Sequence, residues 1–117
     1  MGEQKVMFTS QIMPGANPEQ MQWFNELQRI TTSPEIAARL RLAMGDIDVR
    51  PLLAEIVTPT LVLHAREDAV APFEGGRKMA AMIPNARFVP LESANHLLIE
   101  SEPAWPRFLA EVRSFLE

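Results

Sequence analysis

The second half of this 117-residue chain alternates short apolar runs with helix-like patterns, and this alternation constrains the fold more than any other feature. Residues 59–64 (PTLVLH) form a continuous, partly β-branched run that is typical of a strand covered on both faces, and residues 86–91 form a second strand-like run. Residues 73–83 and 103–117 carry apolar side chains at helical spacing. A strand, a helix, a strand and a helix with short connections predict a right-handed βαβα unit with two parallel strands, and therefore an α/β fold class.

The first part of the chain, up to Gly45, is predicted to be helical. Asn17 precedes a proline and is followed three residues later by Gln20, which together form the capping-box signature of a helix start. A similar signal recurs at Ser33, and Gly45 is the expected end of that second helix. Residues 48–56 are a candidate for a further short helix. The simplest interpretation of the two long helices is a helical hairpin that packs on another surface and has no chemical role.

These patterns divide the chain into a helical segment, residues 1–47, and an α/β segment, residues 48–117. The chain is long enough for one domain and too short for two, so we expect both segments to belong to a single structural domain.

Composition excludes several classes of function. The net charge of −4 and a pI near 5.2 provide no basic surface, so we expect no direct binding of nucleic acid. The chain contains no cysteine, which excludes disulfides and thiolate metal sites and suits the cytoplasm. No apolar run is long enough to span a bilayer and no signal peptide opens the sequence, so we expect a cytoplasmic protein without a membrane segment.

Three segments of the second half resemble the α/β-hydrolase superfamily. Residues 59–72 (PTLVLHAREDAVAP) resemble the strand and turn that carry the catalytic acid, and residues 83–92 (IPNARFVPLE) resemble the last strand. The pair Asn95-His96, followed by residues 100–103 (ESEP), resembles the catalytic-histidine loop that leads to the final helix. The segments occur in the order and at the spacing that this superfamily shows.

The resemblance covers the chain from about Asp48 to its end. Residues 8–45 are similar, more weakly, to the helical cap that such proteins insert before the acid strand. Residues 102–112 (EPAWPRFLAEV) resemble hydrolase-like domains of bacterial regulatory proteins that are fused to LuxR-type helix-turn-helix or nucleotide-cyclase modules.

The resemblance implies that Asp68 is the acid and His96 the general base of a Ser-Asp-His triad. Their positions agree with this assignment, because each lies in a loop after a strand, at the edge where α/β sheets bind ligands. Glu67 is the rival acid, since it is adjacent to Asp68 in the same turn.

The nucleophile is the missing member of this triad. A nucleophile elbow requires Gly-x-Ser-x-Gly between a strand and a helix, because only small residues permit that strained turn. None of the serines has glycines two residues away on both sides; they are Ser10, Ser33, Ser93, Ser101 and Ser114. No His-Gly-Gly oxyanion motif is present either. We therefore expect the chain to be the C-terminal part of a larger α/β-hydrolase domain and to be unable to hydrolyse esters alone.

A metal site is the main chemical alternative at these positions. His64, Asp68 and His96 supply suitable ligand atoms, but His64 is expected to end a buried strand, so we expect no metal. The resemblance implies triad chemistry, which needs no cofactor, so we expect none.

Two functions remain open at this point. The first is a serine-hydrolase fragment whose parent protein cleaves a small ester-like substrate. The second is a non-catalytic module that senses a ligand or mediates assembly within a bacterial regulator. In either case two parallel strands leave an uncovered sheet edge, so we expect a homodimer or pairing with the missing N-terminal half.

Overall fold

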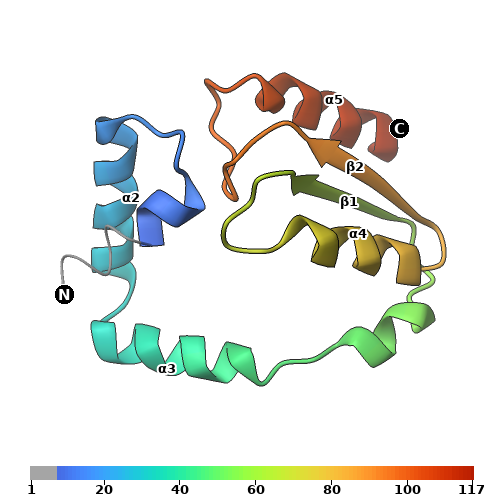
Figure 1. Ribbon diagram of the computed structural model, residues 1–117, viewed down its shortest axis with the longest axis horizontal. Coiled ribbons are helices and arrows are strands. Elements are labelled where there is room, and N and C mark those ends of the chain that lie inside the picture. The colour runs from blue at the N-terminus through green and yellow to red at the C-terminus, as the bar shows by residue number, and fades with distance from the viewer. Residues whose placement is uncertain (1–7) are drawn as a thin grey trace.

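The computed structural model describes residues 8–117, so the start of the predicted helical segment, residues 1–7, lies outside the described residues. Two parallel strands, β1 (Thr60–Ala65) and β2 (Ala86–Leu91), form a sheet. Helix α4 (Phe73–Met82) lies on one side of this sheet and α5 (Ala104–Leu116) on the other (Figure 1). The predicted α/β class and βαβα order are confirmed.

The predicted helix starts are also confirmed. Helix α2 (Pro18–Thr31) begins with a capping box, in which the Asn17 side chain accepts from the backbone of Gln20 at 2.8 Å and the Gln20 side chain accepts from the backbone of Asn17 at 2.9 Å. Helix α3 (Pro34–Gly45) begins in the same way, because the Ser33 hydroxyl accepts from the backbone N–H of Ile36 at 3.2 Å. The candidate helix over residues 48–56 is a short 3₁₀ helix, η1 (Arg50–Glu55).

The predicted helical hairpin is wrong. In the described part of the chain α2 and α3 make no contact with each other, neither contains a buried residue, and they run in different directions beside the sheet (Figure 1). The reason is the linker: Thr32 and Ser33 are both in extended conformations, which carry the chain onward instead of folding it back. Apolar side chains of both helices therefore remain exposed, such as Trp23 on α2 and Leu40 on α3.

Two clusters of buried apolar residues lie in the described part of the chain. One lies between the sheet and α5, where Val89, Leu91 and Ala104 are buried and Leu63 and Phe108 pack against them. The other joins the beginning of the described chain to the loop that follows His96. This second cluster consists of Ile12, Met13 and Ile99, with Phe8 and Phe24 at its margin.

The second cluster gives residues 8–16 a structural role that the sequence patterns did not reveal. Thr9 is fully buried and donates to the Asn25 side chain, while it accepts from the Gln28 side chain at 2.9 Å. These hydrogen bonds fasten the segment to α2. The segment therefore connects α2 to the loops at the edge of the sheet.

The strand β1 is less covered than its apolar sequence predicts. Only Val62 and Ala65 are buried, although helices lie on both faces of the sheet. Within residues 8–117 the strand pairs only with β2, so its other edge has no partner strand. Among the described residues no helix is both long and apolar enough to cross a membrane.

Substitution of Leu91 tests the core between the sheet and α5. Leu91→Ala should lower the free energy of unfolding by about 2–5 kcal/mol, because its side chain is only 3% exposed and its removal leaves a cavity. Leu116→Ala is the matched control; this leucine is 76% exposed, and its removal should change stability by about 0.5 kcal/mol or less. Urea denaturation followed by circular dichroism measures both values. Equal losses in the two variants would contradict this account of the core.

Candidate functional site

Asp68 and His96 meet at the carboxyl ends of the two strands. Their side chains form a hydrogen bond of 2.7 Å between Asp68 Oδ2 and His96 Nδ1, although the residues are 28 positions apart. The parallel pairing explains the meeting, because the loops that follow adjacent parallel strands leave the sheet at the same edge. The structure therefore brings together both residues of the predicted acid–base pair.

Glu67, the rival acid, occupies a different position. Its backbone N–H donates to the carbonyl of Ser93 at 3.1 Å, and the residue is exposed. Only Asp68 of the two acids contacts the imidazole of His96. The geometry thus favours Asp68 over Glu67 as the acid.

The Asp68 carboxylate is buried, and both of its oxygens accept hydrogen bonds. Its side chain is 4% exposed, and Oδ1 accepts from the backbone N–H groups of Val70 and Ala71 at 2.8 Å each. Burial alone would raise the pKa of Asp68, but the Ala71 N–H, the His96 imidazole and the Val70 N–H outweigh burial, so the pKa is lowered from its ordinary 3.8. The acid is therefore ionised at neutral pH and oriented by its own loop.

The His96 imidazole is held at one nitrogen and open at the other. Because an ionised carboxylate only accepts hydrogen bonds, Nδ1 must carry the proton that it shares with Asp68. The Nε2 atom then bears the lone pair of the neutral ring, and among residues 8–117 it has no hydrogen-bond partner. The side chain is 41% exposed. This tautomer and this exposure are what a general base requires.

A polar network of buried Asn95 and half-buried Ser93 and Glu102 holds the loop that carries His96. The Asn95 side chain donates to Glu102 Oε2 at 2.8 Å and accepts from the backbone N–H of Gly15 at 2.9 Å. The Ser93 hydroxyl donates to the other oxygen of Glu102 and accepts from the backbone N–H of Asn95 at 2.9 Å. The network is satisfied throughout, so it fixes the loop without an unpaired buried group.

The segment at the beginning of the described chain also touches the histidine loop directly. The backbone N–H groups of His96 and Leu97 both donate to the carbonyl of Ile12, at 2.7 Å and 3.2 Å. The sequence signals did not reveal this support or the role of Glu102. The available hint was the cluster of polar residues around His96, at Ser93, Asn95 and Glu102.

A hollow of about 380 Å³ lies beside the acid–base pair. His64, Asp68, Asn95 and His96 form its polar part. The rest of its wall is mainly leucine and aromatic side chains: Leu63, Leu91, Leu97, Leu98, Trp105 and Phe108. A hollow with such a lining is suited to bind a small apolar group.

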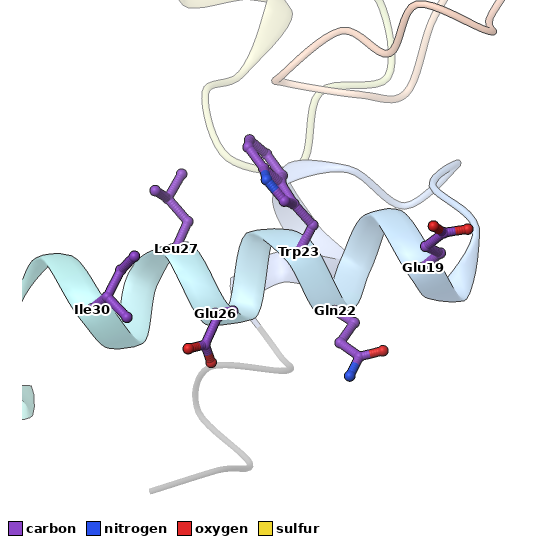
Figure 2. Close-up of a pocket in the computed structure, with 6 residues that line it drawn as sticks. All are labelled: Glu19, Gln22, Trp23, Glu26, Leu27 and Ile30. Carbon is purple, nitrogen blue, oxygen red and sulfur yellow. The ribbon is translucent and has the colours of Figure 1, made fainter.

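A second hollow, of about 420 Å³, lies along α2 and away from this pair. Trp23 and Leu27 project from one side of the helix and Gln22 and Glu26 from the other (Figure 2). All of its lining residues belong to this one helix, and none of them touches Asp68 or His96. It therefore offers no catalytic arrangement.

The three residues considered for a metal site lie close together. His64 Nε2 is 3.7 Å from Asp68 Oδ2, the same oxygen that contacts His96. Among residues 8–117, however, no group of three or more His, Asp or Glu side chains is arranged to hold a metal ion. His64 Nε2 instead lies 2.8 Å from the carbonyl oxygen of Ala71.

Comparisons with known proteins agree with the fold. The family model described as TAP-like protein, an α/β-hydrolase family, matches residues 32–114. The chain belongs to this family and, through it, to the α/β-hydrolase superfamily.

Individual relatives give the same result. The AB hydrolase superfamily protein YisY of Bacillus subtilis is 35% identical over 80 residues, which cover 68% of this chain and 30% of that protein. The RutD protein of Serratia proteamaculans, named as a carbamate hydrolase, is 34% identical over 76 residues, 62% of this chain and 28% of that protein. An esterase of Exiguobacterium antarcticum superposes with a TM-score of 0.83 at 25% identity, over 98% of this chain and 42% of the esterase. The chain thus spans less than half the length of each of these proteins.

Replacement of Asp68 tests the electrostatics of the pair. Folding lowers the pKa of Asp68, so its stabilising effect is complete above its ordinary pKa of 3.8 and is lost as the pH falls through the lower folded-state value. Asp68→Asn should therefore be less stable than the wild type at pH 7, and its stability should fall less steeply below about pH 4.

The adjacent substitution Glu67→Gln is the matched control and should keep the wild-type pH dependence. Urea denaturation between pH 2 and pH 7, at steps of about half a unit, measures the slopes. A wild-type slope in Asp68→Asn would show that Asp68 is not the ionised partner.

Proposed function

We propose that Asp68 and His96 are the acid and the general base of a serine-hydrolase triad, and that another segment of a longer polypeptide supplies the serine. The observation that carries this proposal is the 2.7 Å contact between Asp68 and His96 Nδ1, which leaves Nε2 open beside an apolar hollow. Membership of the α/β-hydrolase superfamily supports it. The chain spans 30% of its Bacillus relative, which leaves room in such a protein for the remaining parts of a triad.

The proposed chemistry follows from the tautomer of His96. Nε2 removes the proton from the serine hydroxyl while the serine oxygen attacks the substrate carbonyl carbon. The resulting imidazolium is stabilised by the ionised Asp68 carboxylate, to which its Nδ1–H remains bonded. Nε2 then donates its proton to the leaving group as the acyl bond breaks. A water molecule then gives a proton to Nε2 while its oxygen attacks the acyl carbon. Nε2 returns that proton to the serine oxygen as the bond between serine and the acyl group breaks.

The serines of this chain are poorly suited to act as that nucleophile. The Ser93 hydroxyl shares the histidine loop but donates to Glu102. The Ser33 hydroxyl caps α3. No serine in the sequence lies in a Gly-x-Ser-x-Gly turn, which is the geometry that exposes a nucleophile at this edge of the sheet. We therefore propose that residues 1–117 alone do not turn over esters.

The substrate class we propose is a small ester or carbamate with an apolar acyl part. Leucine and aromatic side chains line most of the hollow beside His96, which favours an apolar group there. The names of two similar proteins, a carbamate hydrolase and an esterase, fit cleavage of an acyl bond to oxygen or nitrogen. Triad chemistry of this kind needs no cofactor. A cytoplasmic location fits the absence of cysteine.

The alternative is a non-catalytic hydrolase-like module of a bacterial regulator. The sequence of residues 102–112, which resembles such domains, supports this alternative. The two functions differ in what the gene encodes outside these residues. A Gly-x-Ser-x-Gly motif upstream favours the hydrolase, whereas a helix-turn-helix or cyclase segment without that motif favours the regulator.

Labelling with a fluorophosphonate probe tests the proposal. Residues 1–117 alone should show no labelling, because no serine is activated. A longer polypeptide that joins them to a Gly-x-Ser-x-Gly segment should be labelled and should hydrolyse p-nitrophenyl acetate. In that polypeptide His96→Ala should lower kcat by roughly 10³-fold or more. Glu67→Gln is the control and should keep full activity; wild-type turnover in His96→Ala would overturn the assigned base.

We also propose that the outer edge of β1 and the exposed apolar residues of α2 and α3 bind a second polypeptide segment. In a longer protein this is the preceding half, and when the chain is alone it is a second copy. The support within residues 8–117 is the outer edge of β1, which has no partner strand there, together with exposed apolar residues of α2 and α3, such as Trp23, Ile30, Leu40 and Met44. In solution at micromolar concentration the chain should therefore be a dimer or larger.

Multi-angle light scattering after gel filtration measures this mass. Leu40→Glu should shift the population towards the monomer, because it places a charge on an exposed apolar helix face. Glu35→Gln, on the same helix, is the control and should leave the mass unchanged. A folded wild-type monomer at these concentrations would contradict self-association.

A further inference from the structure

We infer that His64 is a positioning residue for the Asp68–His96 pair. It holds the acid loop, residues 66–72, by a hydrogen bond to the carbonyl of Ala71. The inference deepens the proposed function and rests on it for the consequence in catalysis. The positioning itself is a property of this chain and is measurable without any hydrolytic activity.

The contacts of His64 and Asp68 meet at one residue of the loop, Ala71. The His64 Nε2 atom lies 2.8 Å from the Ala71 carbonyl oxygen, and the Ala71 N–H donates to Asp68 Oδ1 at 2.8 Å. Because a carbonyl oxygen only accepts, His64 must carry its proton on Nε2. The same Nε2 lies 3.7 Å from Asp68 Oδ2, the oxygen that accepts from His96. His64 therefore holds Ala71 from one side while Asp68 holds it from the other.

The imidazole of His64 occupies a fitted position between the sheet and α4. Its side chain is 13% exposed, and its ring meets the ring of Phe73 edge to face at 5.8 Å between centroids. A Cβ atom placed on Gly76 would lie 2.3 Å from His64 Nδ1, which is far inside contact distance. The neighbouring Gly75 has open space around it. Gly76 thus provides the room in which the ring of His64 reaches Ala71.

The consequence is a fixed carboxylate for His96. Asp68 Oδ2 has to stay within hydrogen-bond reach of Nδ1 to keep the proton on that nitrogen and the lone pair on Nε2. A loop that is anchored at Ala71 holds the carboxylate in this place. Without the anchor the carboxylate samples other orientations, and the proton of His96 is shared between its two nitrogens. In this scheme His64 acts on His96 through Asp68.

Nitrogen-15 spectra of the imidazole groups test the inference on residues 1–117. The chain has two histidines, so replacing His64 leaves His96 as the only imidazole signal. The wild type should show the His96 proton on Nδ1 at pH 8. His64→Leu should raise the fraction of the Nε2–H tautomer of His96 several-fold. His64→Gln should keep the wild-type signal of His96, because its side-chain amide is able to donate to the Ala71 carbonyl.

A pair of glycine variants tests the same anchor from α4. Gly76→Ala should displace His64 and reproduce the His96 spectrum of His64→Leu, whereas Gly75→Ala should leave it unchanged. Both variants favour helix formation, so a difference between them reports on the ring of His64 and not on the stability of α4. If His64→Leu does not fold, this pair decides the question.

Asp68→Asn separates failure of this inference from failure of the proposed function. If Asp68→Asn changes the His96 tautomer but His64→Leu and Gly76→Ala do not, His64 only fills space and the inference is overturned. If Asp68→Asn itself leaves the His96 spectrum unchanged, the acid–base pair does not form, and the proposed function fails together with the inference.

Discussion

The parallel pairing of β1 with β2 is the interaction on which the rest of the site depends. The register sets Ala65 opposite Leu91, and the hydrogen bonds continue past the strands, from the Arg66 N–H to the Leu91 carbonyl at 3.0 Å and from the Glu67 N–H to the Ser93 carbonyl at 3.1 Å. Asp68 then reaches His96. A slip of one residue would move one loop by about 3.3 Å along the other, which exceeds the tolerance of a hydrogen bond.

Each loop is held by its own polar contacts. Backbone N–H groups of the acid loop donate to the Asp68 carboxylate. The hydrogen bond between the Asn95 and Glu102 side chains holds the histidine loop. The carbonyl of Ile12 adds a support from the helical part of the chain. This arrangement fixes the orientation of the Asp68 and His96 side chains, as their proposed roles of acid and base require. The proposed triad still requires a serine and an oxyanion-stabilising site from another segment of a longer polypeptide.

The sequence predicted the features that local signals encode. The helix starts at Asn17 and Ser33, the two strands, and the pair Asp68 and His96 followed from caps, apolar runs and family motifs. Other features depend on residues that only the folded chain brings together: the burial of Ile12, the hydrogen bonds of Glu102, and the space beside Gly76 that the His64 ring occupies. The helical hairpin was predicted wrongly because no local pattern reports that α2 and α3 lack a common contact surface.

The coupling between Asp68 and His96 tests the central claim most directly. A double-mutant cycle with Asp68→Asn, His96→Gln and the double variant measures it from the free energies of unfolding at pH 7 and one fixed protein concentration. The account predicts a favourable coupling of about 1–3 kcal/mol, as expected for a hydrogen bond to an ionised group. A coupling within about 0.3 kcal/mol of zero would mean that the two side chains do not form a pair in this chain, and would contradict the account.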